Sequence, residues 1–149
     1  MRLHRRILGG TAAVVLVAGV PAVADAASYG GFTRQNWPIS IEVSRDRREV
    51  VRAGIGFELT CSAGIRLDLD RYRGLVLHRN GRFSSTYANL RSDTLPDGGY
   101  FVSGGSLAGR LNRARTSISG TVSLNYTRHD AAGAVTDSCD SGRVKYTAR

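Results

Sequence analysis

The residues of this chain best suited to chemistry are its only two cysteines, Cys61 and Cys139. A metal site would need further ligands close by, and a catalytic thiol would need a histidine partner. Two lone cysteines in an exported protein usually form a disulfide. We therefore predict one structural disulfide between them, and the chain-entropy relation gives it about 4 to 5 kcal/mol of stabilisation for so long a loop.

The other reactive side chains do not assemble into a catalytic pattern. His78 and His129 lie next to predicted turns, where histidines are usually exposed. Gly104–Ala108 approaches the nucleophile elbow of hydrolases, but Ala108 replaces the second glycine and no strand-to-helix turn follows. Asp137 is predicted to point inward beside Cys139, either as a buried acid with a raised pKa or paired with an arginine. We expect no catalytic residue, no metal and no cofactor.

Residues 1–26 have the features of a secretory signal peptide. Arg2, Arg5 and Arg6 precede an apolar stretch from Ile7 to Val20, and Ala24-Asp25-Ala26 fits the small-x-small cleavage rule. The stretch is shorter than the roughly 20 residues that a membrane span needs. We predict a mature chain of residues 27–149 that forms one secreted β domain without a transmembrane segment. It would be extracellular or associated with the cell wall, or periplasmic if the source has an outer membrane.

The mature chain is basic, which favours an anionic partner. Without three arginines and one aspartate of the signal peptide it carries 18 basic and 11 acidic residues, a net charge of +7. Arginines are dense at residues 45–52, and Arg110, Arg113 and Arg115 are our candidate contacts to an anionic cell-surface polymer. A merely solvated surface is the alternative. Nucleic acid is disfavoured, because no basic stripe is interleaved with stacking aromatics.

Apolar and polar residues alternate with period two, which is typical of half-buried strands. The longest such strand runs over residues 51–61 and ends on Cys61, and an earlier one covers Ile39 to Val43. In a later strand Ile65, Leu67 and Leu69 alternate with Arg66, Asp68 and Asp70, so we expect the aliphatic residues inside and the aspartates solvated.

Turn signals separate further strands. Asn80-Gly81 between apolar runs is typical of a hairpin whose two central residues have positive φ. Asp93–Gly99 is predicted to be a loop, and no sustained helical stripe occurs in the mature chain. We predict an all-β fold of roughly eight to ten short antiparallel strands. Alternation alone does not distinguish a β-sandwich from a β-barrel.

A short internal repeat fixes one strand register. Residues 106–112 match residues 117–123 in the order of small, apolar, glycine and polar positions. Their parity predicts an even-length loop that places Leu107 opposite Val122 and Gly109 opposite Gly120. Two facing glycines leave a gap. Either a large residue of the opposite layer, such as Trp37 or a tyrosine, fills it, or Gly109 and Gly120 form the floor of a ligand pocket.

The same parity argument applies to the C-terminal strands. An even loop around Asp130-Ala131 would place Cys139 opposite Val122, with the cysteine pointing into the core. The apolar parity then changes before Val144, so Ser141-Gly142 is predicted to be a bulge or tight turn.

Two segments carry a resemblance to known proteins. Residues 30–43, from Gly30-Gly31-Phe32-Thr33-Arg34-Gln35 through Ile39-Ser40-Ile41-Glu42-Val43, and the closing residues 139–149 resemble small secreted β-rich proteins of actinobacteria and related bacteria that have a single cysteine pair. The resemblance implies a secreted β fold with one disulfide. It implies no functional residue.

Three functional hypotheses follow from these features. A non-enzymatic secreted or wall-associated binding module is preferred, because export, a rigid β scaffold and basic charge suit it. A small-ligand carrier is the alternative, with an apolar molecule held in the barrel behind Gly109 and Gly120. A small secreted hydrolase is the third.

Overall fold

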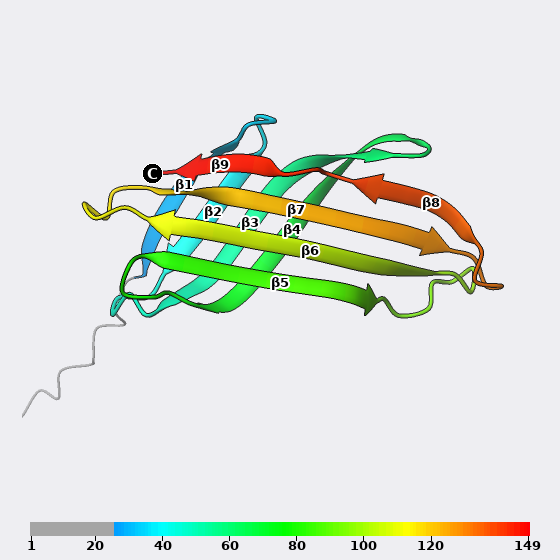
Figure 1. Cartoon of the computed structure of the whole chain (residues 1–149), viewed down its shortest axis with the longest axis horizontal. Helices are drawn as coiled ribbons and strands as arrows, with labels where there is room; N and C mark the ends of the chain where they lie inside the picture. The colour runs from blue at the N-terminus through cyan, green and yellow to red at the C-terminus, as the bar shows by residue number, and fades with distance from the viewer. Residues whose placement is uncertain (1–25) are drawn as a thin grey trace, which may run out of the picture.

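A computed structural model describes residues 26–149, which form nine β-strands and no helix (Figure 1). The predicted signal peptide lies almost wholly outside these residues. Within this range no helix is long and apolar enough to cross a membrane. The strands are β1 (Ala27–Thr33), β2 (Pro38–Val43), β3 (Glu49–Cys61), β4 (Gly64–Val76), β5 (Arg82–Arg91), β6 (Tyr100–Leu111), β7 (Ile118–His129), β8 (Val135–Asp140) and β9 (Val144–Ala148).

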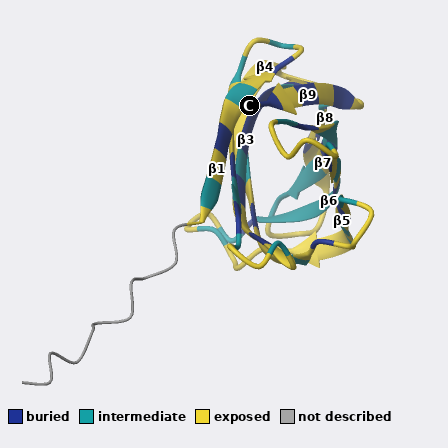
Figure 2. Cartoon of the chain, turned by 90° about the vertical axis from the view of Figure 1, so that its left-hand side faces the viewer, coloured by how far each residue is buried: buried dark blue, intermediate teal, exposed yellow. Residues whose placement is uncertain are grey.

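The strands form an antiparallel barrel. The hydrogen-bonded order is β4-β3-β2-β1-β9-β7-β6-β5, and β8 pairs with both β7 and β3. β1, β2, β3, β8, β7 and β9 therefore close into a ring of six strands, to which β4, β5 and β6 are added. This arrangement resolves the choice between sandwich and barrel in favour of the barrel. Figure 2 shows the β1 and β3 wall facing the β5–β7 wall across the interior.

Gln35 helps to close the ring where β3 changes partner. β3 pairs with β2 as far as Ile55 and with β8 from Thr60 onward. Between these ladders the Gln35 side chain accepts from the Glu58 N–H at 2.9 Å and donates to the Glu58 carbonyl at 3.3 Å. The side-chain amide thus satisfies a stretch of backbone that no strand covers.

The period-two prediction holds for β2 and for β3 from Ala53 onward. Val51, expected inside, is 39% exposed and Val50 is buried in its place, because a bulge at Glu42/Val43 shifts the register. Ile39, Ile41 and Val43 are buried, and so are Ile55, Phe57 and Leu59 of β3. These side chains share one face of each strand and fill the barrel. Burial of this continuous apolar set is the main contribution to stability.

The prediction for β4 has the faces reversed. Ile65, Leu67 and Leu69 are exposed by 71%, 59% and 48%, although they were expected inside. Asp68 pairs with Phe57 and Asp70 with Ile55, so the aspartates lie on the same side of the sheet as buried β3 residues. Asp68 is nevertheless exposed, as expected, and Asp70 is half-buried. Alternation shows which residues share a face. It does not show which face the rest of the chain covers.

The Asn80-Gly81 turn exists, but it does not join a hairpin. Of its two central residues, Asn80 and Gly81, only Gly81 has positive φ, at 79°. β4 and β5 lie at opposite ends of the strand order, so the turn carries the chain from one wall to the other. The Leu111 N–H donates to the Gly81 carbonyl. This hydrogen bond fixes the turn against the end of β6.

The register predicted from the repeat is confirmed. Leu107 lies opposite Val122, Leu111 opposite Ile118 and Gly109 opposite Gly120. The gap at the glycines is filled: a methyl group on Gly109 would overlap the Phe83 ring, and one on Gly120 would overlap the Tyr146 ring. The gap is thus filled by large residues, a tyrosine among them, as one of the two interpretations required. They come from neighbouring strands of the same sheet, however, and not from the opposite layer as expected.

The disulfide Cys61–Cys139 is present, but Cys139 is not opposite Val122. It pairs with Tyr126 of β7 and, across the ring, with Cys61 of β3. The predicted parity was right and the register was wrong by four residues. The β7–β8 turn is centred later, with Gly133 at a φ of 88° and a bulge at Arg128/His129. Ser141-Gly142 forms the predicted turn into β9, with Gly142 at a φ of 59°.

Candidate anion-binding surface

Three turns pack together at one end of the barrel. They connect β2 to β3, β4 to β5 and β6 to β7 (Figure 1). The Leu77 N–H donates to the Arg48 carbonyl at 2.8 Å, which joins the first turn to the second, and the Leu111 N–H donates to the Gly81 carbonyl at 2.9 Å, which joins the second to the third. The Tyr29 hydroxyl donates to the Arg115 carbonyl at 3.1 Å. The three turns therefore form one surface.

Short polar side chains hold each turn through hydrogen bonds to its backbone. Asp46 accepts from the Ser44 hydroxyl at 2.7 Å and from the Arg48 N–H, and these two hydrogen bonds lower the pKa of its carboxyl. Asn80 accepts from the Arg82 N–H, and Asn112 accepts from the Thr116 N–H at 2.8 Å. Asx side chains commonly stabilise turns in this way.

Two of these turns place an arginine in the left-handed region of φ. Arg47 has a φ of 56° and Arg115 a φ of 61°. Glycine or asparagine is the usual residue at such positions, because the Cβ atom of an L-residue crowds the backbone carbonyl there. Both side chains line a groove of about 790 Å³ between the turns, whose cations are Arg45, Arg47, Arg79, Arg110, Arg113 and Arg115. We call this groove the turn groove.

A second groove of about 810 Å³ runs over the outer face of β5, β6, β7 and β9. We call it the outer groove. Its cations are Arg34, Arg82, Arg110 and Lys145, and it shares His78 and Arg110 with the turn groove. The two grooves together form the basic surface.

The strand register explains why cations meet in the outer groove. Arg82 of β5 lies directly opposite Arg110 of β6, and Arg110 lies opposite Ser119 of β7. Like charges directly opposite across a strand pair destabilise a sheet. In the described part of the chain no acidic residue lines the outer groove, and Asp46 alone lines the turn groove.

The ion pairs among residues 26–149 involve other cations, although one of them includes Asp46 of the turn groove. They join Arg48 to Asp46, Arg52 to Glu42, Arg66 to Asp137 and Arg128 to Asp97. The cations of the basic surface take no part in them. These guanidinium groups therefore keep their donors available to an anion.

The structure brings the three predicted contacts together and adds others. Arg110, Arg113 and Arg115 line one groove, as the density of charge on a single turn suggested. Arg34, Arg82 and Lys145 were missed, because they come from three distant segments that only the cross-strand register aligns.

The interior does not offer the ligand gap of the carrier hypothesis. Tyr146 lies over Gly120 and donates from its hydroxyl to the Ala108 carbonyl at 3.1 Å, and Phe83 covers Gly109. Phe83 and Tyr146 are themselves 2% and 3% exposed. The two glycines instead contribute backbone to the outer groove on the opposite side of the sheet.

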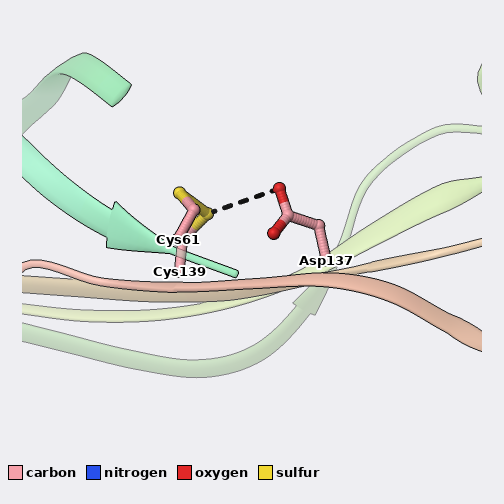
Figure 3. Close-up of side chains that lie close together, drawn as sticks. All are labelled: Cys61, Asp137 and Cys139. Atoms are coloured by element: carbon pink, nitrogen blue, oxygen red, sulfur yellow. Dashed lines mark hydrogen bonds between the residues drawn. A yellow bond between two sulfur atoms is a disulfide. The ribbon is translucent and has the colours of Figure 1, made fainter. Parts of the chain in front are cut away.

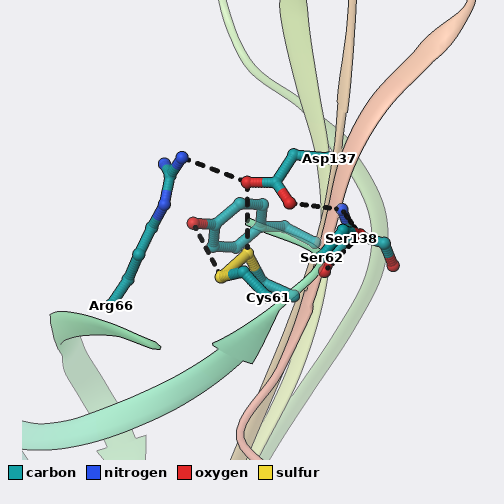
Figure 4. The surroundings of a disulfide bond; sticks show 7 residues. Cys61, Ser62, Arg66, Asp137 and Ser138 are labelled. Carbon is teal, nitrogen blue, oxygen red and sulfur yellow. Dashed lines mark hydrogen bonds and ion pairs between the residues drawn. A yellow bond between two sulfur atoms is a disulfide. The ribbon is translucent and has the colours of Figure 1, made fainter. Parts of the chain in front are cut away.

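A second polar cluster surrounds the disulfide at the junction of β3 and β8 (Figure 3). Asp137 is 6% exposed and one of its oxygens lies 3.8 Å from the Cys139 sulfur. Arg66 reaches this carboxylate from β4 at 3.1 Å, and the Ser138 N–H donates to it at 3.0 Å (Figure 4). Asp137 points inward as parity predicted, and of the two alternatives the structure shows the pair with an arginine.

The disulfide cluster has limited chemical capacity. The carboxylate of Asp137 lies near both sulfur atoms, a grouping that resembles a metal-ligand set. The sulfurs are bonded to each other, so neither is a thiolate that could bind a metal. His78 lies in the basic surface, away from Asp137, so this histidine and this acid do not share a site that could serve a hydrolase.

His129 is held in a stack rather than facing a cleft. Its ring lies parallel to that of Tyr100 at 4.7 Å, and the Arg91 guanidinium covers the other side of Tyr100 at 3.6 Å.

Comparison with protein-family models, with curated proteins and with solved structures found no match to this chain.

Proposed function

We propose that this chain is a non-enzymatic extracellular binding module whose basic surface holds an anionic polymer of the cell surface. The observation that carries the proposal is the facing pair Arg82 and Arg110, which lies in a groove without an acidic partner. Such a pair costs stability in the free protein, and an anion bound between the two guanidinium groups removes that cost.

The extent of the surface favours a polymer over a small anion. The cations come from the three turns, from the β1–β2 connection and from β5, β6 and β9, and they line two grooves that share Arg110. A single phosphate or carboxylate would contact one or two of them. A chain of repeated anionic groups could engage both grooves, and hydroxyls of Ser84, Ser119 and Thr121 in the outer groove are suited to its neutral units.

An extracellular site of action is supported by two features. Residues 1–26 have the pattern of a signal peptide, and the disulfide is typical of an oxidising compartment. A polymer of the cell wall or outer surface is the anionic partner that a basic module meets there.

The test measures retention of the mature chain, residues 27–149, on immobilised poly(glycerol phosphate) at increasing salt. Binding should weaken as salt rises, because counterions compete for the polymer. Arg82→Ser with Arg110→Ser should reduce the slope of log K against log salt by about two, since each lost contact removes about one released counterion.

The control removes the same charge elsewhere. Arg71→Ser with Arg73→Ser changes two exposed arginines of β4 that line neither groove. Equal weakening by both double variants would show attraction to net charge rather than a site. No retention of the unaltered chain, or tighter binding of a single-stranded oligonucleotide, would refute the proposal.

A further inference from the structure

β4 carries an apolar stripe that the rest of the described chain leaves uncovered. Ile65, Leu67 and Leu69 are 71%, 59% and 48% exposed and lie side by side on the outer face of the strand. The exposed half of β4 is visible at the top of Figure 2. Contiguous exposed aliphatic residues on an edge strand are typical of an interaction surface.

The stripe coincides with a free strand edge. β4 is the last strand in the order and pairs only with β3. The N–H groups of Leu69 and Arg71 donate to the carboxylates of Asp68 and Asp70, at 2.7 and 2.8 Å. These N–H groups therefore point away from β3. Because the direction alternates along a strand, the N–H of Leu67 points to the same open side.

We infer that this edge binds a second copy of the chain, with β4 antiparallel to β4 of the partner and Leu67 on the two-fold axis. Residues that face each other across a two-fold strand pair must lie on the same face of the sheet. In this register Leu67 meets its own counterpart, and Ile65 meets Leu69 of the other copy. Each exposed aliphatic side chain gains an apolar cross-strand neighbour.

Charge complementarity selects this register. With Leu67 on the axis, Arg66 of each copy lies opposite Asp68 of the other, so opposite charges face each other twice. Shifting the axis to Asp68 would place the two Asp68 carboxylates against each other, which is unfavourable. Arg66 can keep its bond to Asp137, because a guanidinium group has donors on several sides.

The sequence Ile65-Arg66-Leu67-Asp68-Leu69 thus matches itself when read antiparallel. This self-complementarity favours a second copy over an unrelated partner. The N–H of Leu69 would exchange the Asp68 carboxylate for a carbonyl of the other copy, which frees Asp68 to face Arg66. This inference does not depend on the proposed function.

Cross-linking tests the register directly. Leu67→Cys should give a covalent dimer under mild oxidation, because directly paired strand residues lie within disulfide reach. Leu69→Cys should not, because its two copies would be four residues apart along the strands, roughly 13 Å. Leu90→Cys is the matched control, since Leu90 is 58% exposed on the other edge strand and lies outside the stripe. The native cysteines are buried and bonded to each other.

Sedimentation of the unaltered oxidised chain at increasing concentration supplies the second measurement. We expect a monomer–dimer equilibrium, lost in Leu67→Asp and retained in Leu90→Asp. A monomer throughout the concentration range would overturn the inference. Cross-linking of Leu69→Cys as fast as Leu67→Cys would overturn the register, and loss of the dimer in Leu90→Asp alone would place the interface on β5 instead.

Discussion

Replacing Gly120 with alanine should cost the fold far more than the same change at Gly30. A methyl group on Gly120 would overlap the Ala108 carbonyl oxygen and the Tyr146 ring, whereas one on Gly30 would have no neighbour within 4 Å. Both glycines lie in strands and neither has positive φ. The pair therefore isolates the effect of the filled space from the effect of losing a glycine.

The magnitude follows from the contacts. Forcing a methyl group into a filled interior costs about 1 to 3 kcal/mol. The displaced Tyr146 hydroxyl would also lose its 3.1 Å bond to the Ala108 carbonyl, which contributes about 1 kcal/mol. We expect a decrease of about 2 to 4 kcal/mol in the free energy of unfolding for Gly120→Ala, and an increase of about 0.5 kcal/mol for Gly30→Ala.

Urea unfolding followed by circular dichroism measures both variants. With a slope of about 1 to 3 kcal/mol/M, the midpoint of Gly120→Ala should decrease by roughly 1 to 2 M. Gly109→Ala adds a further control, because the groups it would overlap are side-chain atoms of Phe83 and Tyr146 rather than backbone. Phe83→Leu should rescue Gly109→Ala in part and should not rescue Gly120→Ala. Equal stability of Gly120→Ala and Gly30→Ala would refute the filled gap.

Three other outcomes are expected. Burial raises the pKa of Tyr146 above its usual 10.0, and burial followed by Asp70 raises that of Tyr87 to about 12. Their protonated forms stabilise the fold fully below pH 10, and this stability decreases above it, by about 1.4 kcal/mol per pH unit for a buried tyrosine such as Tyr146. Urea midpoints against pH should show the decrease, and Tyr146→Phe should reduce it. Cys61→Ala and Cys139→Ala should each lower stability by about 4 kcal/mol and leave polymer retention intact, and loss of retention at full stability would contradict a structural role. Arg115→Gly should relieve a φ of 61° and raise the unfolding midpoint, while it weakens salt-sensitive retention. Unchanged retention would remove Arg115 from the basic surface.

The sequence was most informative where contacts are local. The β6–β7 register followed from a repeat and an even loop, because few residues separate the two strands. The register of Cys139 was missed by four residues, since a bulge and a glycine at positive φ move the centre of the turn. Such a shift by an even number of residues leaves the same side chains pointing inward, whereas the residue opposite Cys139 changes.

Long-range features could not be predicted in the same way. The faces of β4 were reversed, because the period of two is the same whether the aliphatic side is covered or open. Arg110, Arg113 and Arg115 could be found because they are close in sequence, at the end of β6 and in the turn after it, but Arg82 becomes significant only once β5 is known to pair with β6. The outer groove of the basic surface is therefore a consequence of topology, because Arg34, Arg82 and Lys145 come from distant segments.

The pairing of β1 with the C-terminal residue has a mechanical consequence. The N–H of Gly30 donates to the carbonyl of Arg149 at 2.9 Å and the N–H of Arg149 to the carbonyl of Gly30 at 2.7 Å. β1 and β9 are antiparallel, so the start of β1 and the end of β9 lie at the same end of their ladder. A force that pulls these two points apart would break the hydrogen bonds of the ladder one after another. The 78-residue loop closed by the disulfide could not lengthen. Under tension the chain should peel first at its ends, and the turns between β4 and β5 and between β6 and β7 should stay folded longest.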